Sequence, residues 1–275
     1  MTRLISKQVA DIPSSLGLYD DELIRITGAS LIEIACSAAR IKPAEFDRAV
    51  RGIKFAAVPF AVGLGVIGGF SRAVESIACH IGCSAFTTKG QDITGLTEAI
   101  ERGAGVLLIA DDQRFVAIHL TGGWVIDNDE ATARGYVVAL DKMIDGGVSG
   151  RNVLVIGAGR LGSRVIATLL EYRAKPAVYD LDHAVAERSG RVVGVKVEAS
   201  LDTALAENLY IIDASPAEGI IRPEHLKPGM AIAAPGIPCG LNNAAYELIK
   251  GRVVHDLLPI GTVTMLAMIA AQLRG

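Results

Sequence analysis

The sequence lacks an excess of charge, a cysteine pattern that binds metal, and an apolar run long enough to cross a membrane. Its net charge of −3 gives no electrostatic reason to expect nucleic acid or an anionic membrane as a partner. The mean hydropathy of +0.39 is high. Yet the longest apolar run, residues 55–70, is broken by Pro59 and several glycines, and it is shorter than the ~20 residues of a membrane span.

The N-terminus has no signal-like stretch, because Asp11 and Pro13 come before an apolar run could develop. We therefore expect a cytoplasmic protein that contacts neither membrane nor nucleic acid. The cysteines, Cys36, Cys79, Cys83 and Cys239, show no metal-binding spacing. We expect small buried side chains in a reducing compartment and no metal.

The familiar catalytic patterns of dehydrogenases are also missing. None of the five histidines lies in a motif for hydride transfer, and there is no Ser–Lys–Tyr pattern of the short-chain type. Any redox chemistry must therefore rely on acidic and amide side chains.

The first half of the chain alternates helical and strand patterns after weakly patterned residues 1–15, which we expect to be mobile. Helical spacing covers residues 18–50, with Asp20 and Ser30 as candidate N-caps. The pattern then predicts strands at 54–59, 84–88, 105–110 and 115–120, the last at a sheet edge, and helices at 71–80, 91–102 and 129–144. This half should form a small α/β domain.

A glycine-rich break at residues 145–150 predicts the domain boundary, with domains at 1–148 and 149–275. The second half predicts strands at 152–156, 176–180, 191–197, 209–213, 231–234 and 252–256, and helices at 160–173, 183–189, 201–206, 241–250 and 261–273. Six strands with helical crossovers match a Rossmann doubly wound parallel sheet. The last helix, apolar on almost all sides, is expected to pack between the domains.

One glycine-rich stretch indicates a dinucleotide site. The run Gly157-Ala-Gly-Arg-Leu-Gly162 stands between a β-branched strand and an amphipathic helix. Gly157 suits the tight turn, Gly159 the close approach of a pyrophosphate, and Gly162 the packing of helix on strand. Arg160 and Leu161 then begin a helix whose N-terminus favours phosphate.

A carboxylate and two later strand ends should complete that site. Asp180 ends the next strand, 23 positions after Gly157, where a carboxylate binds the ribose hydroxyls and repels a 2′-phosphate, so NAD is expected rather than NADP. Small residues at the ends of two further strands leave room for the ribose and nicotinamide: Ala214, Ser215, Pro216, Pro235 and Gly236.

Acidic and amide side chains at other strand ends predict where a substrate binds. Asp111 and Asp112 follow one strand, Asp127 and Asn128 follow another, and Asp256 ends the last strand of the Rossmann half. Carboxylates in such positions suit a cationic substrate such as an amine. Each is also an ordinary residue for a turn or a helix cap.

The chain resembles the PylD family, the dehydrogenases of pyrrolysine synthesis, over roughly residues 20–270. The resemblance rests on Val58-Pro59, Gly65 to Ser71, Ala110-Asp-Asp112 with Phe115-Val-Ala, Val155 to Gly162, Tyr179-Asp180, Pro235-Gly-Ile-Pro-Cys239, and Pro259-Ile-Gly-Thr262 followed by Met265-Leu266. It implies that Asp111 binds a substrate amine and that Asn128 contacts the substrate. Asp256 stands where the family has a glutamate, one methylene longer. The segment from Asp127 to Gly135 is expected to be a loop longer than in archaeal members.

The resemblance also implies a reaction. NAD⁺ would take a hydride from the carbon that bears the terminal amine in the isopeptide of lysine and 3-methyl-D-ornithine. Hydrolysis would then release ammonia and form a semialdehyde, which cyclises with loss of water to pyrrolysine.

Two other readings stay open: a related amino-acid or opine-type NAD dehydrogenase with another diamine-derived substrate, and a non-catalytic NAD-sensing module. Apolar segments favour a homodimer, and the helix at 18–28 is a candidate lid over a small-molecule substrate.

Overall fold

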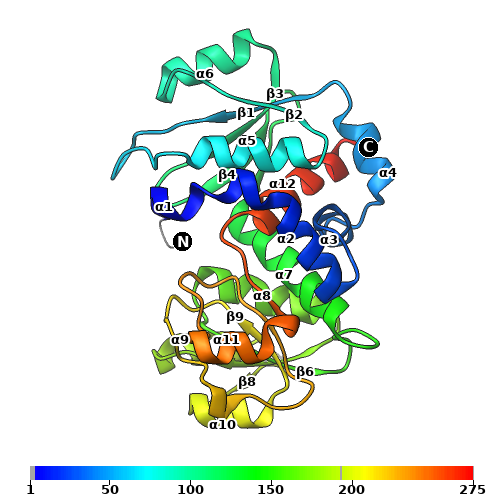
Figure 1. Ribbon diagram of the computed structural model, residues 1–275, viewed down its shortest axis with the longest axis vertical. Coiled ribbons are helices and arrows are strands. Elements are labelled where there is room, and N and C mark those ends of the chain that lie inside the picture. The colour runs from blue at the N-terminus through cyan, green and yellow to red at the C-terminus, as the bar shows by residue number, and fades with distance from the viewer. Residues whose placement is uncertain (1–3, 193, 275) are drawn as a thin grey trace.

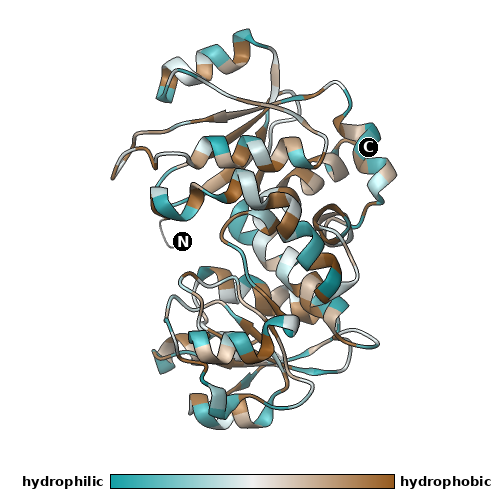
Figure 2. Cartoon of the chain, viewed as in Figure 1, coloured by the Kyte–Doolittle hydropathy of each residue, from teal (hydrophilic) through white to brown (hydrophobic). Residues whose placement is uncertain are grey.

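The computed structural model describes residues 4–192 and 194–274. Figure 1 shows two α/β bodies, one above the other, with helix α7 (Asn128–Met143) between them. The strands of both sheets are mostly apolar, whereas the outer helices mix polar and apolar residues (Figure 2). Within the described residues, no helix is long and apolar enough to cross a membrane.

The N-terminal body holds a mixed five-stranded sheet in the order β2-β1-β3-β4-β5. Its strands are β1 (Lys54–Val58), β2 (Ser84–Thr87), β3 (Ala104–Ala110), β4 (Phe115–His119) and β5 (Trp124–Asp127). β1, β2 and β3 are parallel, and β4 and β5 continue the sheet antiparallel. The prediction of β4 at an edge is wrong, because β5 pairs with its free side.

Helices α1 (Ser6–Val9), α2 (Ile12–Thr27), α3 (Leu31–Ala38) and α4 (Pro43–Val50) precede the sheet, and α5 (Phe70–His80) and α6 (Asp92–Glu101) connect its parallel strands. The segment expected to be mobile, residues 1–15, is mostly helical where the structure describes it. Val9, Ile12 and Leu16 are buried at helical spacing, so burial orders this segment. Residues 1–3 lie outside the described chain.

The two candidate caps behave differently. Ser30 caps α3, with Glu33 completing the capping box. Asp20 lies inside α2 instead and accepts a hydrogen bond from the backbone N–H of Leu31 at 2.6 Å. Its carboxylate therefore joins two helices rather than starting one.

The C-terminal body holds a six-stranded parallel sheet in the order β11-β10-β9-β6-β7-β8. In chain order this is 3-2-1-4-5-6, the doubly wound arrangement, so the predicted fold class is confirmed. The strands are β6 (Asn152–Ile156), β7 (Lys175–Tyr179), β8 (Lys196–Val197), β9 (Tyr210–Asp213), β10 (Ala231–Ala233) and β11 (Val253–Val254).

The helices of this body are α8 (Arg160–Glu171), α9 (His183–Gly190), α10 (Leu201–Glu207) and α11 (Asn243–Ile249), with 3-10 turns at Pro223–His225 and Lys250–Arg252. The strand predicted at 191–197 is largely wrong, since β8 spans two residues and Arg191 is the C-cap of α9. Residue 193 of that prediction lies outside the described chain.

Helix α12 (Pro259–Gln272) leaves the C-terminal sheet and packs against α3, α5 and α7. It is buried over almost its whole length, as its apolar composition implies. Two glycines allow its close crossing with α7. A Cβ at Gly135 would overlap Ile260, and one at Gly261 would overlap Thr132. The crossing places the start of α12 against the start of α7.

The cysteines only partly match expectation. Cys36 and Cys83 are buried, but Cys79 is exposed and Cys239 is partly exposed. Cys79 lies near the end of α5, on the side turned away from that helix's buried residues. The expectation of four buried thiols is therefore wrong.

Candidate active site between the two bodies

A cavity of about 350 Å³ lies between the two bodies and is lined by both. This volume is within the range of small-molecule sites. Three predicted substrate residues, Asp111, Asn128 and Asp256, line this one cavity. So do most of the predicted cofactor residues: Gly159, Arg160, Leu161, Ala214, Ser215, Pro216, Pro235 and Gly236.

One face of α7 forms part of the cavity wall. Asn128, Asp129, Thr132 and Tyr136 line it at helical spacing. The helix predicted at 129–144 is confirmed. The longer loop from Asp127 to Gly135 that the family resemblance implied is wrong, because this segment is the first half of that helix. Asp127 is its N-cap and accepts a hydrogen bond from the N–H of Asp129 at 2.9 Å. Helical spacing from Asn128 along the predicted helix at 129–144 could have identified Asp129 and Tyr136 from the sequence.

Asp256 is held by three hydrogen bonds to its carboxylate. The hydroxyl of Tyr19 donates to Oδ2 at 2.6 Å, and the backbone N–H groups of Leu258 and Ile260 donate at 2.8 and 3.3 Å. Burial raises the pKa of Asp256, and the hydrogen bond from Tyr19 opposes that rise. The carboxylate also lies at the N-terminus of α12, where the helix favours negative charge.

Tyr136 fixes the backbone of the same residue. Its hydroxyl donates to the carbonyl of Asp256 at 3.0 Å and accepts from the N–H at 2.9 Å. Burial raises the pKa of both Tyr19 and Tyr136 well above the ordinary phenol value. Both phenols therefore stay protonated near neutral pH. Tyr19 was not identified from the sequence, since it lies 237 residues from its partner.

Asp111 begins the turn between β3 and β4. Its Oδ1 accepts hydrogen bonds from the N–H groups of Gln113 and Arg114, both at 2.7 Å. The residue is exposed at the rim of the cavity. Its neighbour Asp112 accepts from the N–H of Leu64 at 2.6 Å. One carboxylate oxygen of Asp111 therefore holds the turn through hydrogen bonds, and the side chain also borders the cavity.

The glycine-rich turn has the shape that its sequence predicts. Gly157 adopts φ +89°, which side chains rarely tolerate. A Cβ at Gly162 would overlap the carbonyl of Gly157, so the helix lies tight on the turn. A Cβ at Gly159 would meet nothing within 4 Å. This open space stands at the N-terminus of α8, where free backbone N–H groups bind anions.

Asp180, Gly157 and Gly162 do not line the cavity but belong to the adjoining turn. Asp180 directly follows β7, and its Oδ2 accepts a hydrogen bond from the backbone N–H of Ala158 at 2.7 Å. Oδ1 accepts from the N–H of Asp182 at 2.9 Å. The carboxylate therefore stands beside the glycine-rich turn, at the carboxyl end of the sheet.

A buried carboxylate supports the Ser215 strand end. Asp213 is fully buried and accepts hydrogen bonds from the Ser215 hydroxyl at 2.7 Å and its N–H at 3.1 Å. Burial raises the pKa of Asp213 to about 6. A Cβ at Gly240 would overlap this carboxylate. The run Asp-Ala-Ser at a strand end was the available signal, but only the fold shows that Asp213 points inward.

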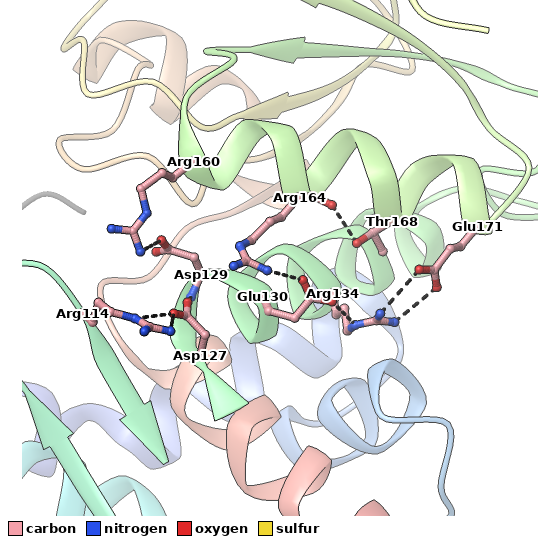
Figure 3. A network of polar contacts seen from close by, with 9 residues as sticks. All are labelled: Arg114, Asp127, Asp129, Glu130, Arg134, Arg160, Arg164, Thr168 and Glu171. Carbon is pink, nitrogen blue, oxygen red and sulfur yellow. Dashed lines mark hydrogen bonds and ion pairs between the residues drawn. The ribbon is translucent and has the colours of Figure 1, made fainter. Parts of the chain in front are cut away.

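Ion pairs join α7 to α8 beside the cavity (Figure 3). Arg160 lies 2.8 Å from Asp129, and Arg164 lies 2.7 Å from Glu130. Further along, Arg134 pairs with Glu130 at 2.7 Å and with Glu171 at 3.3 Å. Of these residues, Arg160 and Asp129 line the cavity.

The fold defines a class: two α/β bodies, of which the second has the strand order of the Rossmann fold and carries a glycine-rich turn of the dinucleotide-binding type. The solved structures agree in fold. Shikimate dehydrogenase from Aquifex aeolicus has a TM-score of 0.53 and 15% identity, over 76% of this chain and 88% of that one. Quinate dehydrogenase from Corynebacterium glutamicum, solved in complex with NAD, has a TM-score of 0.50 and 17% identity, over 81% and 97%.

Sequence comparison is more specific. Residues 8–126 match the N-terminal domain of the pyrrolysine biosynthesis protein PylD. Pyrrolysine synthase of Methanosarcina barkeri is 29% identical, over 78% of this chain and 80% of that protein. Its counterpart from Methanosarcina acetivorans is 28% identical over 78% and 81%. These matches confirm the resemblance to the PylD family and show that the chain is similar to the pyrrolysine synthases.

Proposed function

We propose that the protein oxidises the terminal amine carbon of the isopeptide of lysine and 3-methyl-D-ornithine, with NAD⁺ as hydride acceptor. The imine formed takes up water and releases ammonia to leave a semialdehyde. The ornithine α-amine then attacks the aldehyde, and loss of water closes the pyrroline ring of pyrrolysine.

One observation carries the proposal: two carboxylates and the glycine-rich turn border a single cavity. Asp111 and Asp256 border it from the two bodies, and Gly159 opens onto it from the N-terminus of α8. Carboxylates suit the ammonium groups of the substrate. The homology to pyrrolysine synthases supports this substrate over another diamine derivative.

The residues of the glycine-rich turn fit a dinucleotide. The open space beyond Gly159 and the first turn of α8 would take the pyrophosphate. Asp180 would bind the ribose hydroxyls and repel a 2′-phosphate, which favours NAD over NADP. When bound, the nicotinamide accepts the hydride.

The carboxylates would handle the proton. An amine carbon gives up hydride only when its nitrogen lone pair is free, so a bound ammonium must first lose a proton. Asp111, exposed at the rim, could pass that proton to water. Asp256, held by Tyr19 and by backbone N–H groups, would orient the substrate from the other side.

The test is NADH formation, followed by absorbance, with the purified isopeptide as substrate and mass spectrometry of the product. Asp111→Ala should lower kcat/KM by about 100-fold or more, the scale of a lost acid–base group, while NAD⁺ affinity stays within about twofold. Glu101→Gln, an exposed carboxylate on α6 outside the cavity, is the control. Full activity of Asp111→Ala would remove this residue from the site, and no NADH from the wild type would refute the function.

A further inference from the structure

We propose that Asp129 is a further substrate-binding carboxylate, which Arg160 neutralises until the dinucleotide binds. In this exchange the Arg160 guanidinium turns from Asp129 to the cofactor pyrophosphate. The freed Asp129 then takes an ammonium group of the substrate. The second half of this inference rests on the proposed function, whereas the first half concerns the dinucleotide alone.

The two partners differ in freedom. The Asp129 side chain is 8% exposed, while that of Arg160 is 52% exposed. Asp129 stands in the first turn of α7, where its backbone N–H is bound by Asp127, so its position is set by the helix. The long Arg160 side chain reaches across from the other body and also donates to the Gln113 carbonyl at 3.1 Å. Of the two, Arg160 is therefore the residue that can move.

Arg160 stands where a pyrophosphate would arrive. It is the first residue of α8, directly after Gly159, and it lines the cavity. A guanidinium binds phosphate oxygens with two parallel hydrogen bonds. The phosphates would thus compete with Asp129 for the same donor.

Once the Arg160 guanidinium has turned away, Asp129 is a buried carboxylate without its paired cation. A buried carboxylate without a partner is strongly disfavoured, and it recruits another cation. Asp129 lines the cavity beside Asn128, so an amine of the substrate is the cation within reach. Cofactor binding would then precede and strengthen substrate binding.

The next ion pair along the two helices provides a matched control. Arg164 and Glu130 join α8 to α7 at 2.7 Å, much like Arg160 and Asp129, but neither lines the cavity (Figure 3). Removing this pair should loosen the contact between helices without touching either ligand. An effect shared by both pairs would be structural.

The first experiment measures NADH affinity by fluorescence titration. Arg160→Gln should weaken NADH binding by about 10-fold or more, with partial recovery in Arg160→Lys, because a charge-assisted phosphate contact is lost. Asp129→Asn should tighten NADH binding by about 3- to 10-fold, because Arg160 then has no ion pair to break before it contacts the phosphates. Glu130→Gln and Arg164→Gln should stay within about twofold. Unchanged NADH affinity in Arg160→Gln, or weaker binding in Asp129→Asn, would overturn the exchange.

The second experiment measures isopeptide affinity by calorimetry with and without saturating NADH, which binds without turnover. The wild type should bind the isopeptide about 10-fold more tightly with NADH, a coupling of ordinary size. In Asp129→Asn that enhancement should vanish, and in Glu130→Gln it should persist. An enhancement that survives in Asp129→Asn refutes the role of Asp129. An isopeptide that neither binds nor reacts refutes the proposed function, while the NADH titrations still decide the exchange.

Discussion

Replacing Tyr19 with phenylalanine tests whether a residue far from Asp256 in the chain controls its charge. The phenol donates to Oδ2 of Asp256 at 2.6 Å, at a partly buried position where the hydrogen bond opposes the rise in carboxyl pKa. Tyr19→Phe removes that donor and keeps the ring. The pKa of Asp256 therefore rises further, and a larger share of the enzyme carries a neutral carboxyl at a given pH.

The expected magnitude follows from the bond lost. A hydrogen bond to a charged group contributes about 1.5–3 kcal/mol. At pH values below the pKa of Asp256, its loss therefore lowers the ionised fraction of this carboxyl by about 10- to 150-fold. If the ionised carboxylate orients the substrate ammonium, kcat/KM at acid pH should fall by that factor. At higher pH, where Asp256 is ionised in both proteins, the deficit should shrink.

The assay is the pH profile of kcat/KM for NADH formation, recorded for wild type and Tyr19→Phe. The acid limb of the kcat/KM profile should lie at higher pH in Tyr19→Phe than in the wild type. Tyr246→Phe, a partly buried tyrosine of α11 outside the cavity, serves as the control and should leave the limb in place. A uniform loss at all pH values, with an unmoved limb, would refute the reasoning and leave Tyr19 a packing residue.

Three further predictions concern the cofactor, pH and packing. Asp180→Ala should weaken NAD⁺ binding by about 1–3 kcal/mol, since a charged hydrogen-bond partner is lost; an unchanged dissociation constant would place the ribose elsewhere. Asp213, whose folded pKa is about 6, binds a proton more tightly folded than unfolded. Its stabilising contribution is therefore full below about pH 4 and is lost as pH rises through about 6. Urea unfolding should therefore give a larger stability of wild type relative to Asp213→Asn at about pH 4.5 than at about pH 7.5, two values near the ends of the titration of Asp213. A stability difference that stays constant or grows with pH would contradict this. Gly135→Ala should cost about 1–3 kcal/mol of unfolding free energy because its Cβ would overlap Ile260 on α12. Gly17→Ala, where a Cβ on α2 meets nothing, should instead stabilise by about 0.5–1 kcal/mol; equal effects in thermal unfolding would refute the close crossing of α7 and α12.

Local pattern was enough for the parts of the fold that depend on near neighbours. The run from Gly157 to Gly162 needs a positive φ and a close helix, and both requirements are visible in the glycines themselves. The six-strand order of the C-terminal sheet follows from alternating strand and helix patterns with right-handed crossovers. Most helices there begin and end within a few residues of the prediction.

The errors arose where burial or pairing decided the outcome. Residues 6–16 form helices because Val9, Ile12 and Leu16 are buried by partners that the local pattern does not reveal. β4 lies inside the sheet because β5 pairs with it. The helix predicted at 129–144 is confirmed, whereas the loop that the family resemblance implied at 127–135 is wrong, because Asp127 caps α7.

The sequence by itself determined the glycine-rich turn, the parallel sheet and the acidic residues at the strand ends that line the cavity, because each depends on residues close together in the chain. Only the tertiary structure decided which side chains pair with the carboxylates of the cavity. Tyr19 reaches Asp256 across 237 positions, and Arg160 reaches Asp129 from the opposite body. Such pairs depend on how α7, α8 and α12 cross, and helix crossings are set by packing across the whole core rather than by local propensity.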